Sequence, residues 1–249
     1  SCALPGTNKA SPELRIPTSD EFSSNQLGLQ WQWQANPDAT WYDLSSRPGF
    51  LRLNAVPPPG RLANLWHLPN ILAQKFPAER FAAKACLSLH SSALGDCAGL
   101  IILGCDYACL SLHQRQGGMM LELALCLNAD QDGEESIVAA VPLTQSEVYL
   151  NVRVQSGGHC TFSYSLDDLL YAPLAGAFIA APGKWVGAKI GLYALAATAE
   201  PSAGAAPLPR GPSDESTGWA DFDFIRFDCS CQIEQDPSSG VLDSQEVFR

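Results

Sequence analysis

The feature that most constrains the fold is a regular alternation of polar and apolar residues from Ser146 to Gln155. Successive side chains of a β-strand point to opposite faces, so this pattern predicts a strand with one buried and one wet face. A helix would repeat every 3.6 residues, and that periodicity is nearly absent from the chain. The apolar residues of this predicted strand are Val148, Leu150, Val152 and Val154.

Similar alternation recurs along the chain between clusters of Gly, Pro, Asp or Ser. The segments are Arg80 to Leu89, Met119 to Asn128, Cys160 to Leu166 and Trp219 to Phe227. Ala98 to Gly104 has no polar alternation, which predicts a strand buried on both faces. Many short strands with few helices are typical of a β-sandwich or barrel, and we expect an all-β fold of two stacked antiparallel sheets.

Composition divides the chain into one folded domain and two polar ends. We expect a polar leader at 1–17, a single sandwich domain at 18–231 and an acidic tail at 232–249. A loop rich in Ala, Pro, Ser and Gly is inserted at 198–217, before the last predicted strand. A length of 249 residues is compatible with one all-β domain.

The charge balance limits the possible partners. With 15 Lys and Arg against 26 Asp and Glu, the net charge is 15 − 26 = −11. Nucleic acid needs clusters of basic residues, which are missing, so neutral or sparsely charged ligands are favoured. The apolar runs are too short to span a bilayer, which takes about 20 residues. We expect a soluble chain without a membrane partner, and favour a secreted or periplasmic location.

The nine cysteines do not have the spacing of a zinc site. Those within predicted strands are expected to be buried free thiols: Cys86, Cys109, Cys126 and Cys160. Cys229 and Cys231 share one face near a strand end, where they are placed to bridge another cysteine in a secreted protein. The histidines show no catalytic setting and are expected to be structural or on the surface: His67, His90, His113 and His159.

Asp221 and Asp223 are the most prominent carboxylate pair. Two residues apart on a strand, they are predicted to share one face, with Phe222 and Phe224 on the other. A retaining glycosidase uses two carboxyl groups about 5 Å apart, which makes catalysis one interpretation. A second is a calcium site completed by Asp20 and Glu21 if the chain ends pair in one sheet, and a third is solvated acids at a strand edge.

Aromatic residues suggest another site. Sugar rings pack their apolar faces on aromatic side chains, and nearby polar groups bind the hydroxyls. Core packing is the competing interpretation for each tryptophan. The candidate carbohydrate-binding residues are Trp31, Trp33, Trp66, Tyr107, Tyr149, Arg153 and Trp185.

Seven short motifs occur in an order that resembles one known module. They are Ser19-Asp-Glu-Phe22, Leu27-Gly-Leu-Gln-Trp-Gln-Trp33, Asn36-Pro-Asp38, Arg47-Pro-Gly-Phe-Leu-Arg-Leu53, Ala98-Gly-Leu100, Gly183-Lys-Trp-Val-Gly-Ala-Lys-Ile-Gly191 and Ala220-Asp-Phe-Asp-Phe224. Together they resemble the C-terminal concanavalin A-like β-sandwich of glycoside hydrolase family 43 β-xylosidases and arabinofuranosidases. That module is also classed as carbohydrate-binding module family 91.

The resemblance implies a concanavalin A-like jelly roll with a structural calcium near Asp20 and the strand of Asp221 and Asp223. It implies a partner as well, because in that family hydrolysis belongs to an N-terminal five-bladed propeller. In some members a sandwich loop reaches the partner's pocket with an aromatic side chain, and the loop from Phe178 to Trp185 is similar. One departure is that Leu65 to Lys75 lacks an arginine common in the family.

The favoured function is therefore a non-catalytic module that binds xylan or xylo-oligosaccharides beside a family 43 catalytic domain. The alternative is a structural appendage that stabilises and completes a neighbouring active site through an apolar docking patch, without sugar affinity of its own. A third hypothesis makes the chain a glycosidase that uses Asp221 and Asp223. It is disfavoured because the Glu-x-Asp-x-Glu arrangement of sandwich glycosidases is missing.

Overall fold

The structure is a computed structural model that describes residues 18–58, 63–91, 93–197 and 218–230. The predicted leader, the inserted loop at 198–217 and the tail fall outside these residues. The described part contains no helix long and apolar enough to cross a membrane. Its helices are short 3-10 turns: η1 (Ala39–Trp41), η2 (Leu65–His67), η3 (Ala129–Gln131) and η4 (Ser156–Gly158).

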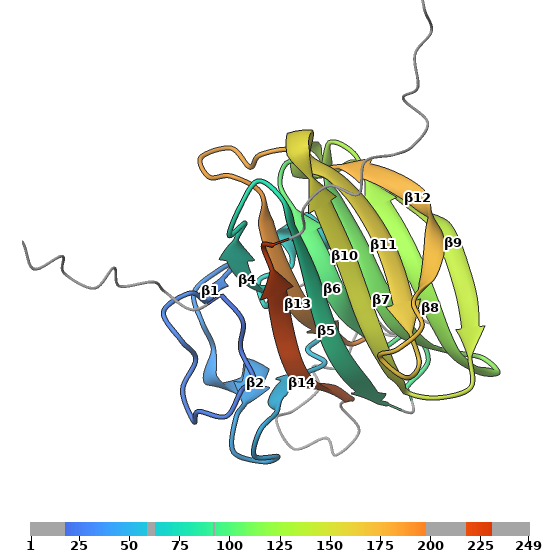
Figure 1. The fold of residues 1–249 in the computed structure, drawn as a ribbon. Coiled ribbons are helices and arrows are strands. Elements are labelled where there is room, and N and C mark those ends of the chain that lie inside the picture. Colours follow the sequence, from blue (N-terminus) through green and yellow to red (C-terminus); the bar gives the residue numbers. More distant parts are fainter. Residues whose placement is uncertain (1–17, 59–62, 92, 198–217, 231–249) are drawn as a thin grey trace, which may run out of the picture.

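Two seven-stranded antiparallel sheets pack face to face (Figure 1). The front sheet, toward the viewer in Figure 1, has the order β12-β11-β10-β5-β14-β3-β2. Its strands are β12 (Ala172–Ile179), β11 (His159–Ser165), β10 (Glu147–Gln155), β5 (Phe81–His90), β14 (Trp219–Asp228), β3 (Leu51–Asn54) and β2 (Tyr42–Asp43).

The back sheet has the order β1-β4-β13-β6-β7-β8-β9. Its strands are β1 (Gln32–Trp33), β4 (Leu72–Lys75), β13 (Lys189–Leu195), β6 (Cys97–Leu103), β7 (Tyr107–Arg115), β8 (Gly118–Cys126) and β9 (Glu135–Leu143). The predicted all-β fold of two stacked antiparallel sheets is confirmed. Each segment with period-two alternation forms a strand, and every residue of β6 is buried as predicted.

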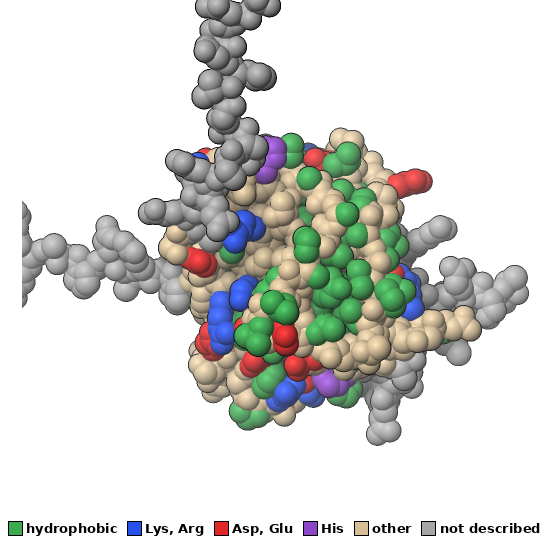
Figure 2. Space-filling view, turned by 45° about the vertical axis from the view of Figure 1, so that its right-hand side comes forward, with side chains coloured by type: hydrophobic (Ala, Val, Ile, Leu, Met, Phe, Trp, Pro, Cys, Tyr) green, Lys and Arg blue, Asp and Glu red, His purple; other side chains and the backbone are tan. Residues whose placement is uncertain are grey.

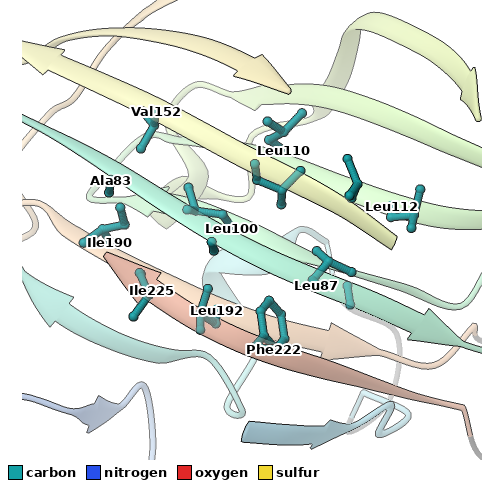
Figure 3. Close-up of a cluster of buried hydrophobic side chains, with 14 of the residues drawn as sticks. Ala83, Leu87, Leu100, Leu110, Leu112, Val152, Ile190, Leu192, Phe222 and Ile225 are labelled. Carbon is teal, nitrogen blue, oxygen red and sulfur yellow. The ribbon is translucent and has the colours of Figure 1, made fainter. Parts of the chain in front are cut away.

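The main core lies between the sheets and is built from the inward residues of both (Figure 3). Val152 of β10 and Ala83 of β5 face Leu100 and Leu110 of the back sheet, while Ile225 of β14 lies near Ile190 and Leu192 (Figure 3). All of these side chains are fully buried. The four strand cysteines are buried free thiols, as predicted, whereas Cys231 lies outside the described residues.

A second core covers the outer face of the back sheet. Leu65, Leu68 and Ile71 pack there on outward residues such as Tyr107 and Tyr193. Hydrogen bonds hold this covering segment in place: the Asn64 side chain donates to the carbonyls of Ala129 and Gly133, the Asn70 side chain donates to that of Ala194, and the Leu65 amide donates to the Tyr107 hydroxyl.

The two ends of the described chain pair with each other, which the predicted calcium site required. Asp20 and Ile225 exchange backbone hydrogen bonds of 2.8 and 2.9 Å in an antiparallel bridge. Glu21 forms a two-pronged ion pair with Arg226 at 2.7 Å. The start of the domain is therefore fixed to β14 of the front sheet.

Candidate functional site

A groove with a volume of about 700 Å³ crosses the outer face of the front sheet. Strand register aligns its floor in cross-strand rows. One row runs from β14 to β12 through Arg226, Lys84, Asn151, Ser163 and Pro173, each paired with the next. Tyr171, directly before β12, also lines the groove. Because alternate residues of a strand share a face, all these floor positions point away from the core.

The row beside it runs through Asp228, Ala82, Arg153 and Thr161, again in strand register. All four residues line the groove. Arg153 and Thr161 are exposed, so a guanidinium and a hydroxyl are open to a ligand at this level of the sheet.

Interactions within the groove hold the Tyr171 side chain in place. Lys84 Nζ lies 4.7 Å from the Tyr171 ring centre and 3.0 Å from an Asp168 carboxylate oxygen. The Tyr171 hydroxyl donates to the same oxygen of Asp168. Burial raises the pKa of Tyr171 and the Asp168 carboxylate raises it further, so the phenol stays protonated. Next to it, the Asn151 amide donates to the Ser163 hydroxyl at 2.9 Å.

Only some of the predicted aromatic residues reach solvent. Tyr107 is fully buried, and its hydroxyl donates to Glu135 at 2.6 Å. Trp31 is 8% exposed in the main core, and its indole N–H donates to Asp20 at 2.8 Å. Burial removes both residues from the candidate sugar-binding set, because neither ring face is open to a ligand.

Trp33 and Trp66 are partly buried and belong to other surfaces. Trp33 packs against Trp41 and Tyr42, with ring centres 5.3 and 5.4 Å apart. Trp66 lies in the covering segment behind the back sheet, where its indole N–H donates to the Gly104 carbonyl. The structure therefore does not gather the predicted aromatic residues into one platform.

Tyr149 and Arg153 are the candidates on the outer face of the front sheet. Arg153 lines the groove. Tyr149 lies one row away, opposite Cys86, and its ring centre is 6.4 Å from that of Phe224. The strand that first indicated the fold thus also provides part of the site.

Trp185 is 94% exposed in the segment that joins β12 to β13 (Figure 1). Phe178, at the other end of the loop that resembles an active-site element of the family, is 3% exposed and lies in the main core. Trp185 is therefore the side chain of this pair that is available to a partner.

The predicted acidic pair is split by a β-bulge. The register of β14 against β5 shifts between Phe222 and Phe224, which leaves Asp223 as the extra residue. Phe222 lies in the core, whereas Phe224 pairs with Cys86 and carries the Arg226 guanidinium 3.7 Å from its ring centre. The prediction that Phe222 and Phe224 share a face is wrong, because the bulge interrupts the alternation.

Asp221 is bound by arginine. It is 2% exposed, and Arg52 donates to both its oxygens at 2.7 and 2.9 Å, with Arg47 at 3.4 Å. Burial raises the pKa of Asp221, but the hydrogen bonds and charge of Arg52 outweigh burial and lower it. The carboxylate is thus ionised and already paired. It is not open to a substrate as the acid or nucleophile of a glycosidase.

Three of the four predicted calcium ligands already have partners within the protein. Asp20 accepts from the Trp31 indole, the Gln30 amide and the Phe22 backbone. Glu21 is paired with Arg226, and Asp221 with Arg52. Across residues 18–230, apart from the stretches the structure leaves out, no three metal-binding side chains come together. The negative charges of Glu21 and Asp221 are therefore already balanced by arginine, without a metal ion.

Several groove residues were missed by sequence reasoning. Lys84, Thr161 and Tyr171 come from three separate parts of the chain and meet through the pairing of β5, β10 and β11. Lys84 and Thr161 fall within predicted strands, whereas Tyr171 lies outside every predicted strand. Which strands are neighbours is a long-range property that alternation does not carry.

Comparisons with known proteins give a consistent result. The chain is 26% identical over 242 residues to a β-xylosidase of Formosa agariphila, covering 85% of this chain and 35% of the relative. It is 27% identical over 173 residues to a putative β-xylosidase of Xylanibacter ruminicola, with coverages of 68% and 29%. The chain thus spans about a third of the length of these curated relatives.

Solved structures share the fold. A xylan β-1,4-xylosidase of Bacillus halodurans superposes with a TM-score of 0.67 at 20% identity, covering 90% of this chain and 40% of that one. A bifunctional family 43 protein of Bacteroides eggerthii gives 0.69 at 23% identity, with coverages of 88% and 26%. At residues 19–208 the chain matches the family described as β-xylosidase C-terminal concanavalin A-like domain, a part separate from the catalytic domain of those enzymes. The chain belongs to this family of C-terminal domains of glycoside hydrolase family 43 β-xylosidases.

Proposed function

We propose that this domain binds xylan or xylo-oligosaccharides in the groove of the front sheet, as an accessory to a family 43 catalytic domain. Membership of the β-xylosidase C-terminal family supports the partner and the ligand class. The proposal includes a secreted or periplasmic location, where the polymer is accessible. Hydrolysis is assigned to the catalytic domain.

The observation that carries the proposal is the combination of polar groups and one fixed ring in a single groove. Asn151, Ser163 and Thr161 offer amide and hydroxyl groups to sugar hydroxyls, and Tyr171 offers an aromatic surface. Because the groove is open and shallow sites bury little ligand surface, we expect modest affinity.

The test is affinity electrophoresis in gels that contain xylan, arabinan or cellulose, each with and without EDTA. We expect retardation by xylan that EDTA leaves unchanged. Asn151→Ala removes one hydrogen-bonding group worth about 1 kcal/mol, so its dissociation constant should rise about fivefold. Gln155→Ala is the matched control, because Gln155 is exposed on the same face of β10 but does not line the groove.

The outcomes separate the possible results. Weaker retardation of Asn151→Ala by xylan, with unchanged retardation of Gln155→Ala and equal melting temperatures, supports sugar binding in the groove. Equal retardation of both variants and the unmodified chain would place sugar binding elsewhere. Absence of retardation in every gel overturns the proposal.

A second candidate function is a structural appendage that docks on the catalytic domain. Apolar side chains on the outside favour it: Trp185 is 94%, Ile179 57%, Ile137 55% and Val138 42% exposed. Figure 2, in which the β9 and β12 side of Figure 1 comes forward, shows hydrophobic side chains gathered there. The affinity gels distinguish this function from sugar binding. An appendage without sugar affinity migrates equally in all gels, and Trp185→Ala leaves that migration unchanged.

A further inference from the structure

Three cationic side chains line the groove on neighbouring strands: Lys84 on β5, Arg153 on β10 and Arg226 on β14. Two of them have carboxylate partners within the protein. Lys84 pairs with Asp168 at 3.0 Å, and Arg226 pairs with Glu21 at 2.7 Å. Their charges are therefore balanced before any ligand arrives.

Arg153 differs from both. It is exposed, and among the described residues it has neither an ion pair nor a side-chain hydrogen bond. Asp228, the acidic residue in its own row, lies beyond Ala82, with the Cα atoms of Arg153 and Asp228 about 10 Å apart at two strand spacings. In a chain with a net charge of −11, this leaves one uncompensated guanidinium inside a groove.

We propose that Arg153 recognises a carboxylate on the sugar, so that the groove favours xylo-oligosaccharides with a uronic acid branch over unsubstituted ones. This inference rests on the proposed function and names its ligand class. The planar guanidinium presents two parallel N–H groups that match the two oxygens of a carboxylate. A neutral sugar hydroxyl has only one oxygen and cannot form this paired contact. Asn151 and Ser163 already offer hydrogen-bonding groups to such hydroxyls.

Spacing along β10 allows the two roles to operate together. Asn151 and Arg153 point to the same side, and two residues of a strand span about 7 Å. Asn151 therefore contacts the main chain of the sugar while Arg153 contacts a group that branches from it. The amide positions the ligand, and the guanidinium discriminates between ligands.

The experiment is isothermal titration of the 249-residue chain with two xylotetraoses, one unsubstituted and one with a single glucuronic acid branch. We expect about two- to fivefold tighter binding of the acidic sugar, the range for one solvent-exposed ion pair. The preference should shrink as NaCl is raised, because salt screens exposed charges. A third ligand, with the carboxyl group reduced to an alcohol, should bind like the unsubstituted sugar.

Variants identify the residue. Arg153→Gln should abolish the preference, so that the variant binds the acidic and the unsubstituted sugar with equal affinity. Arg153→Lys should restore part of it, because lysine keeps the charge without the planar fork. Arg80→Gln is the matched control, since Arg80 is an exposed arginine that bonds Ser156 outside the groove.

Failure of this inference is distinct from failure of the proposed function. Equal affinity for the acidic and unsubstituted sugars, or a preference that survives in Arg153→Gln, overturns the role of Arg153 while the groove keeps its function. No binding of either sugar overturns both. Melting temperatures equal to that of the unmodified chain establish that each variant is folded.

Discussion

The two outer faces of the sandwich differ in solvent exposure: one is covered and the other is open. Behind the back sheet, Leu65, Leu68 and Ile71 cover the strands with a second dry core. Across the front sheet, the outward residues form an open polar groove. Both sheets are seven-stranded and share one core, so the sheet itself does not decide which outer face is open to a ligand. The covering segment decides it, because a dry face has no room for a ligand.

The largest expected effect is a loss of stability from a substitution in the covered face of the back sheet. Leu68 is fully buried. Leu68→Ala leaves a cavity, which should lower the free energy of unfolding by about 2 to 5 kcal/mol. Leu127→Ala, at a 61% exposed leucine, should cost less than about 0.5 kcal/mol. Urea unfolding measures both. Retardation by xylan should persist in Leu68→Ala below its melting temperature, and its loss there would contradict the independence of the two faces.

The next effect concerns His113, a partly buried histidine on the outer face of the back sheet. Burial lowers the pKa of His113 from 6.5 to about 4, so the folded protein holds it neutral while the unfolded chain protonates it. Stability should therefore be full above pH 6.5 and fall between pH 6.5 and 4, by about 3 kcal/mol at 1.4 kcal/mol per pKa unit.

Unfolding in urea at pH 7.5 and 4.5 checks this difference. His113→Gln should lose markedly less stability on acidification than the unmodified chain. The control is His159→Gln, because His159 is exposed on β11 of the front sheet. An equal acid loss in all three proteins would mean that His113 is not the group responsible.

The smallest effect concerns the charged part of the front sheet. Asp221→Asn leaves Arg52 and Arg47 without their carboxylate. The cost should be about 2 kcal/mol, less than the loss of a fully buried pair, because both arginines reach solvent. Glu21→Gln breaks an exposed pair and should cost about 0.5 kcal/mol.

Thermal melts of these two variants and the unmodified chain also test calcium. Because arginine already balances these carboxylates, neither EDTA nor added calcium should move any of the three melting temperatures. A calcium-dependent rise that Asp221→Asn removes would contradict the fit argued from the structure and restore the calcium site.

Sequence reasoning identified the strands and part of the groove. The alternation around Val148 to Val154 identified β10, and its polar positions Asn151 and Arg153 lie in the groove. The same reasoning misjudged Trp31 and Tyr107, because a large aromatic ring satisfies a core position as well as a sugar platform. It also misjudged Phe224, since a bulge depends on the partner strand and leaves no mark in a period-two pattern.

The sequence by itself determined the fold class, because the period of its side chains matches that of a strand and local geometry enforces the match. It also determined the family, through short motifs in a fixed order. Only the tertiary structure decided that Arg226, Lys84, Asn151 and Ser163 form one row. That row depends on which strands pair and in what register, and pairing is set by contacts between residues far apart in the chain.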